Sequence, residues 1–181
     1  MTTNNSKIWI ITGPFQVGKT HFCNTLVNQA QARGLKLAGV ICPPIFEEEI
    51  KTAITIEDLT SYERKILATK RTNETDGLLT ERWAFDEEVM TWGNSILSET
   101  SGCDLLLVDE LGPLEFTRGL GWQNGLHAID NGEYKVAVVV IRPALVETAL
   151  KRWPNAILVE FQARLRKDEI DQIVETILAS A

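Results

Sequence analysis

The chain has 181 residues, of which 44% are hydrophobic and 24% charged, so one domain spanning residues 1–181 can bury a sizeable core. A formal net charge of -7 gives no electrostatic reason to bind nucleic acid or an anionic membrane. The three cysteines and two histidines are too widely separated to form a zinc-binding pattern. The N-terminus is polar, and the apolar segment IWII behind it is too short for a signal sequence or a membrane span. We therefore expect a cytoplasmic protein.

Short apolar segments alternate with helical patterns along the chain. Strands are predicted at residues 7–12, 35–42, 104–110, 134–141 and 156–161. A helix is predicted at 19–33, where Gly34 suits its C-terminal end, and another at the C-terminus, where apolar residues recur at helical spacing from Ile170 to Leu178. This alternation predicts an α/β fold with a mostly parallel central sheet covered by helices on both faces.

Residues 45–85 do not follow this alternation, because they are polar and acidic and contain the period-two segment TAITIED. We interpret them as an antiparallel hairpin or meander inserted after the second strand. A linker between two domains is the alternative. It is the weaker one because Ile54, Ile56, Trp83 and Phe85 are expected to be half-buried.

The segment GPFQVGKT at residues 13–20 fits the pattern of a phosphate-binding loop and lies between a predicted strand and a predicted helix. Glycines let successive backbone N–H groups point at one anion, and the first turn of the helix adds its own free N–H groups. A glycine turn with a surface lysine is the structural alternative. We expect Lys19 to reach the β- and γ-phosphates and the backbone N–H of His21 to contact phosphate. The predicted nucleotide-binding residues are Gly13, Pro14, Phe15, Gln16, Val17, Gly18, Lys19, Thr20 and His21.

The buried segment LLLVDE supplies a carboxylate at the end of a second strand. We expect Asp109 and the Thr20 hydroxyl to hold Mg²⁺, directly or through water. Glu110 follows immediately and is the candidate for orienting the attacking water, with a solvated glutamate at a strand end as the alternative.

Other candidates rest on position alone. Arg142 ends the fourth predicted strand and is the candidate for offsetting charge on the phosphoryl oxygens, and Arg118 is a second candidate. For both, a solvated surface arginine is the favoured interpretation. Glu115 could order the loop near the metal or cap the next helix. Phe161 and Arg164, after the fifth strand, could flank a nucleotide base.

These motifs resemble the cancer-related nucleoside-triphosphatase family of small RecA-like P-loop proteins. The similar segments are ITGPFQVGKTHF, GLKLAGVICPP, AITIEDLTSYERKILA and LLLVDELGPLEF, the last through its Asp-Glu-x-Gly-x-x-Glu pattern. The resemblance implies a three-layer P-loop NTPase and Mg²⁺-dependent hydrolysis of nucleoside triphosphates with loose base preference. The Glu110 position resembles one large branch of P-loop proteins, which implies the strand order 5-1-4-3-2.

The chain departs from the family pattern at three places. Phe15-Gln16 replaces a Pro-Gly pair, so a side chain stands where glycine would allow a positive φ. Pro113-Leu114 replaces a Lys-Met pair, which removes a cation, and Leu165-Arg166 replaces an Asn-Arg pair. These differences bear on turnover and base contacts more than on phosphate binding.

Three functions follow from these residues. The first is a hydrolase in which the loop binds the triphosphate, Mg²⁺ is held by Thr20 and Asp109, and Glu110 activates water. The second is a small-molecule kinase, in which a substrate hydroxyl takes the place of water. The third is a nucleotide-binding accessory module with negligible turnover. In each case we expect a monomer whose partner is a nucleoside triphosphate.

Overall fold

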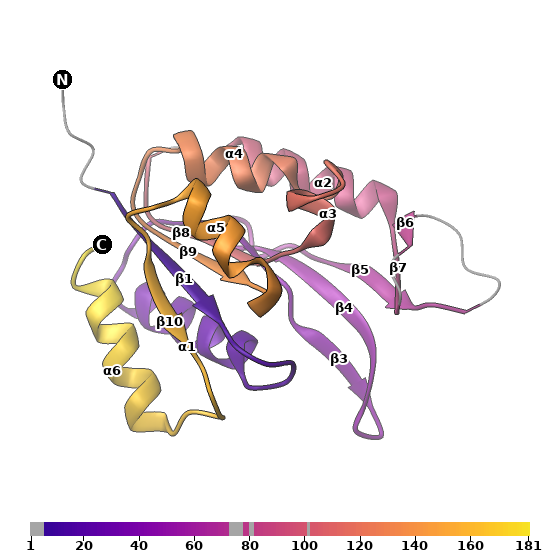
Figure 1. Ribbon diagram of the computed structural model, residues 1–181, viewed down its shortest axis with the longest axis horizontal. Coiled ribbons are helices and arrows are strands. Elements are labelled where there is room, and N and C mark those ends of the chain that lie inside the picture. The colour runs from indigo at the N-terminus through magenta and orange to yellow at the C-terminus, as the bar shows by residue number, and fades with distance from the viewer. Residues whose placement is uncertain (1–5, 73–77, 80–81, 101) are drawn as a thin grey trace.

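The computed structural model describes residues 6–72, 78–79, 82–100 and 102–181 (Figure 1). Within these residues, ten strands form one sheet flanked by helices. Its parallel part has the order β10-β1-β9-β8-β2. The strands are β1 (Lys7–Thr12), β2 (Leu37–Ile41), β8 (Cys103–Leu111), β9 (Tyr134–Ile141) and β10 (Ile157–Glu160). Long runs of buried Val, Ile and Leu in β8 and β9 are typical of central strands covered on both faces.

The segment inserted after β2 continues the same sheet. It contains β3 (Pro44–Glu47), β4 (Ile50–Asp58), β5 (Arg64–Lys70), β6 (Leu78–Leu79) and β7 (Trp83–Phe85), all paired antiparallel. The sheet is joined at this point because Val40 and Ile41 of β2 pair antiparallel with β4.

Numbered along the chain, the five parallel strands lie in the order 5-1-4-3-2, and the inserted strands extend the sheet beyond β2. The order of the whole sheet is β10-β1-β9-β8-β2-β4-β5-β7-β6, and β3 pairs with the edge of β4 that faces away from β5. The hairpin or meander predicted at 45–85 is a set of antiparallel strands that belongs to the main sheet. These strands pack against helix α2 (Glu87–Ser98), which buries Ile54 and Ile56 and half-buries Trp83 and Phe85.

Helices cover both faces of the sheet (Figure 1). One face packs against α1 (Lys19–Ala32) and α6 (Lys167–Leu178) through a core that includes Phe22, Leu26 and Val174. The other face packs against α2, α4 (Gln123–Asn131) and α5 (Val146–Arg152), with the one-turn α3 (Pro113–Phe116) beside them. Among the described residues, the helices are all too short or too polar to cross a membrane.

Candidate active site

The loop between β1 and α1 follows the carboxyl end of β1. Gly13 has φ 150° there, and a Cβ at this position would lie 2.6 Å from the Phe161 carbonyl oxygen. Gly18 has φ 105° and is the residue at which α1 begins. Both glycines are therefore required by the path of the backbone, as a phosphate-binding loop demands.

Gln16 lies in the same loop and also has a positive φ, 61°. A residue with a Cβ is strained in this left-handed region. The backbone geometry therefore supports the expectation that glycine would suit this position. Glutamine is accommodated there with backbone strain.

Lys19, at the start of α1, folds back over the loop. Its Nζ donates hydrogen bonds to the carbonyl oxygens of Gly13 at 2.7 Å and Pro14 at 2.8 Å. Burial lowers the pKa of Lys19, and the carboxylates of Glu110 and Asp109 oppose that lowering. The loop lysine thus shares an electrostatic environment with the acidic pair of β8, although the two are more than 80 residues apart in sequence.

The acidic pair lies in a β-bulge. Val108 pairs with Val139 and Leu111 with Ile141, so two residues of β8 oppose a single residue of β9 at this point. Within the bulge, the backbone of Glu110 is in the left-handed region with φ 72°. Bulges of this kind redirect side chains near strand ends. As a result, Asp109 is buried and the neighbouring Glu110 is exposed.

Asp109 is an unusual carboxylate because only 2% of it is exposed. Burial raises its pKa to about 7, while a hydrogen bond from the Cys42 backbone N–H, 3.0 Å from Oδ2, acts in the opposite direction. A buried carboxylate with one polar partner on one oxygen is suited to a cation.

The donor set fits Mg²⁺ in a nucleotide complex. The described residues contain no group of three or more His, Cys, Asp or Glu side chains that could hold a metal by themselves. Mg²⁺ usually takes only one or two protein ligands and completes its shell with water and phosphate oxygens. One buried aspartate and one hydroxyl group, the role predicted for Thr20, would meet that requirement.

Arg142 follows β9 and is paired with Glu110. The guanidinium lies 2.9 Å from Glu110 Oε1 through Nε and 2.7 Å through a terminal nitrogen. Because β9 lies between β1 and β8, its carboxyl end brings the arginine between the loop and the acidic pair. Arg118, the other candidate arginine, is exposed in the turn after α3.

Glu115 serves the local backbone. It is 7% exposed, and it accepts hydrogen bonds from the N–H groups of Gly112 at 2.8 Å and Trp122 at 2.9 Å. These bonds fasten the start of α3 to the segment before α4. Of the two roles considered for Glu115, they favour the capping one.

Phe161 and Arg164, the two candidates that follow β10, lie in different environments. Phe161 is 2% exposed and packs edge-on against Phe22 with ring centroids 5.4 Å apart, so it is a core residue beneath the loop rather than a partner for a base. Arg164 is exposed, and its Cγ lies 4.0 Å from where a Cβ on Gly18 would stand. Of the pair, Arg164 alone remains a candidate for contacts with the nucleoside.

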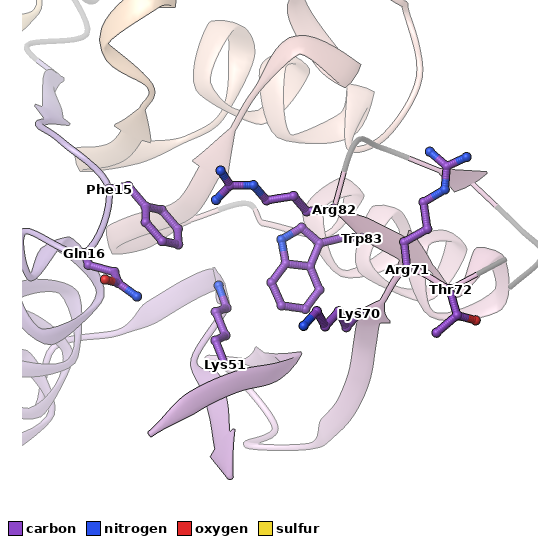
Figure 2. Close-up of a pocket in the computed structure, with 8 residues that line it drawn as sticks. All are labelled: Phe15, Gln16, Lys51, Lys70, Arg71, Thr72, Arg82 and Trp83. Atoms are coloured by element: carbon purple, nitrogen blue, oxygen red, sulfur yellow. The ribbon is translucent and has the colours of Figure 1, made fainter. Parts of the chain in front are cut away.

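A cleft of ≈ 540 Å³ lies between the loop and the inserted strands (Figure 2). The Phe15 ring faces Arg82 across it at 5.8 Å, and Lys51 lies 5.0 Å from the centre of the Trp83 ring. The lining residues are Phe15, Gln16, Lys51, Lys70, Arg71, Thr72, Arg82 and Trp83. Sequence reasoning missed the contribution of the insert, because a lysine or arginine in a polar segment carries no signal of where its strand will lie.

Comparisons with known proteins agree with this geometry. A family model described as NTPase matches residues 8–178. A protein named nucleoside-triphosphatase THEP1 from Methanopyrus kandleri is 28% identical over 174 residues, which cover 93% of this chain and 94% of the relative. A protein of the same name from Saccharolobus solfataricus is 31% identical over 106 residues, 58% of this chain and 59% of the relative.

Two solved structures share the fold. The solution structure of a human cancer-related nucleoside triphosphatase has a TM-score of 0.67 at 16% identity and covers 96% of both chains. The crystal structure of THEP1 from Aquifex aeolicus has a TM-score of 0.66 at 22% identity, covering 94% of this chain and 98% of that one. The family resemblance read from the motifs is confirmed.

Proposed function

Because the chain belongs to the NTPase family, we propose that it hydrolyses nucleoside triphosphates to the diphosphate and phosphate, with Mg²⁺ as its metal and loose base preference. The observation that carries this proposal is the bulge of β8. It leaves one carboxylate buried and the next one exposed, in the electrostatic environment of the loop lysine. Hydrolysis needs these two carboxylates in different roles.

The roles follow from burial and reach. Backbone N–H groups of residues 13–21 and the ammonium of Lys19 bind the phosphates, and the positive end of α1 adds to them. Thr20 and the buried Asp109 would hold Mg²⁺, which would neutralise negative charge on the phosphates. The exposed Glu110 accepts a hydrogen bond from the attacking water and orients it toward the terminal phosphorus.

Arg142 positions Glu110. Its guanidinium fixes one carboxylate oxygen, which leaves the other free to face the water. The same cation lies close enough to help offset charge that builds on the phosphoryl oxygens. We assign neither role to Arg118, which lies in the turn after α3.

The test is phosphate release from the four common nucleoside triphosphates, with and without Mg²⁺, for the wild type beside Glu110→Gln. We expect Mg²⁺-dependent release by the wild type and a loss of about 10²–10⁴-fold in Glu110→Gln, with nucleotide affinity retained. Lys19→Ala should weaken binding and hydrolysis together. Release that is unchanged in Glu110→Gln would contradict the mechanism, and a wild type that binds nucleotide without releasing phosphate would contradict the function.

A further inference from the structure

The wall of the cleft opposite the loop carries a lysine that the proposed mechanism does not use. Lys51 lies near the start of β4, is half-buried, and has its ammonium 5.0 Å from the centre of the Trp83 ring. In Figure 2 this ammonium points into the space between Gln16 and Trp83. The lysine therefore faces the loop rather than bulk solvent.

The charges of the acidic pair on β8 act on Lys51. Burial lowers the pKa of its ammonium, and the carboxylates of Glu110 and Asp109 oppose that lowering. Conversely, the positive charges of Lys51 and Lys19 lower the pKa of Asp109 and so oppose the effect of burial. The terminal phosphate of a nucleotide must face this same acidic pair, because the metal and the attacking water are there.

The side-chain charges around the loop sum to zero before a nucleotide binds, so a further cation would be needed to offset the charge of its phosphates. Lys19 and Arg142 carry two positive charges, and Asp109 and Glu110, when ionised, carry two negative ones. Arg142 is already paired with Glu110. Hydrolysis spreads negative charge over the oxygens of the terminal phosphoryl group, and cations aimed at those oxygens lower the barrier.

We propose that Lys51 is a catalytic residue supplied by the inserted strands, and that its ammonium donates a hydrogen bond to an oxygen of the terminal phosphate of a nucleotide bound at the loop. The cleft would then border that phosphate, since it is lined by Phe15 and Gln16 of the loop as well as by Lys51. This inference rests on the proposed hydrolase function and extends it, because it makes the insert part of the active site. A diphosphate lacks the group that Lys51 contacts.

A purely structural role for Lys51, covering Trp83, is the alternative to be distinguished. The chain offers a matched control, because Lys65 on β5 lies over the Trp92 ring at 4.3 Å in the same manner and pairs with Glu63 at 3.2 Å. Lys65 is not among the residues that line the cleft. Lys51→Met and Lys65→Met each remove one ammonium from a tryptophan and keep the length of the side chain.

The experiment measures affinity for Mg²⁺ complexes of ADP and of the non-hydrolysable β,γ-imido analogue of ATP, together with phosphate release from ATP. Lys51→Met should weaken binding of the analogue by about tenfold, the value of one charge-assisted hydrogen bond, and binding of ADP by less than about twofold. Its kcat should fall by a similar factor. Lys51→Arg should retain most of the preference for the triphosphate analogue, and Lys65→Met should match the wild type.

Equal weakening of both nucleotides by Lys51→Met, or no change in either, overturns the role of Lys51. If the wild type releases phosphate in that case, the hydrolase function stands alone. A wild type that neither binds the analogue nor releases phosphate overturns the function and the inference together.

Discussion

The guanidinium of Arg142 and the carboxylate of Glu110 form an ion pair at 2.7 Å between the ends of two adjacent parallel strands. Both side chains are about half exposed, 53% and 44%. A pair this exposed contributes little to the free energy of unfolding. Its value lies in fixing the position of a carboxylate that stands in a strained bulge.

Arg142→Gln should therefore lower activity without unfolding the protein. We expect a fall in kcat of about tenfold or more, because Glu110 loses its orienting partner and the phosphoryl oxygens lose a nearby cation. The change in unfolding free energy should stay below about 1 kcal/mol. Steady-state phosphate release and chemical denaturation measure the two effects.

Arg152→Gln is the matched control, since Arg152 makes a similar two-nitrogen pair with Asp130 between α5 and α4. That variant should retain full activity. An Arg142→Gln enzyme with wild-type kcat would show that the pair is incidental.

The metal-free protein should become less stable as pH rises, because of Asp109. Its pKa is about 7 when folded, against about 3.9 for an unperturbed aspartate, so the folded state holds this proton more tightly than the unfolded state. The stability due to this proton is fully present below about pH 4 and is lost as pH rises through 7. Asp109→Asn, which cannot ionise, should be more stable than the wild type at pH 8, by on the order of 2 kcal/mol.

Asp104→Asn should show the opposite sign. A hydrogen bond from Lys135, followed by one from the Lys36 backbone N–H, lowers the pKa of Asp104, so its contribution is present above about pH 4 and is lost on acidification. Denaturation of the three proteins without metal at pH 4, 6 and 8 tests both signs. A pH-independent difference between Asp109→Asn and the wild type would rule out a raised pKa at this carboxyl.

Gln16→Gly should stabilise the protein, because Gln16 holds φ 61° in the phosphate-binding loop. Removing the Cβ relieves about 1 kcal/mol of backbone strain, partly offset by the greater freedom of glycine in the unfolded chain. The net gain should be a few tenths of a kcal/mol to about 1 kcal/mol by denaturant titration.

Gly18→Ala provides the reverse test in the same loop. At φ 105° an alanine is strained, although the space at that position is open, with only Arg164 Cγ at 4.0 Å. This variant should lose about 1–3 kcal/mol. If Gln16→Gly destabilises the protein, a side-chain contact of Gln16 outweighs the strain.

Local patterns predicted those parts of the fold that depend on local physics. The apolar run of β9 was placed at residues 134–141, where the strand lies, because a strand buried on both faces leaves an uninterrupted apolar segment. The helix predicted at 19–33 ends at Ala32, and Gly34 follows with φ 69°. The phosphate-binding loop was equally readable, since its glycines are fixed by the backbone path.

The remainder depended on contacts between distant segments. The run LLLVDE gave no sign of the bulge at Asp109 and Glu110, because a bulge is defined by the partner strand as much as by its own residues. Phe161 was assigned a possible contact with a base because its position in the chain does not reveal that its ring packs on Phe22. Lys51 could not be predicted as a residue of the site, because its position depends on the pairing of β4 with β2, which the sequence of either strand alone does not reveal.

The pairing of β2 with β4 also bears on how the enzyme can move. Because Val40–Asp58 and Ile41–Glu57 are paired, the strand that carries Lys51 is joined to the central sheet by backbone hydrogen bonds. Swinging it away from the nucleotide would rupture that ladder. Long side chains that line the cleft, such as Lys51 and Arg82, can by contrast change position by rotation about their own bonds with that ladder intact.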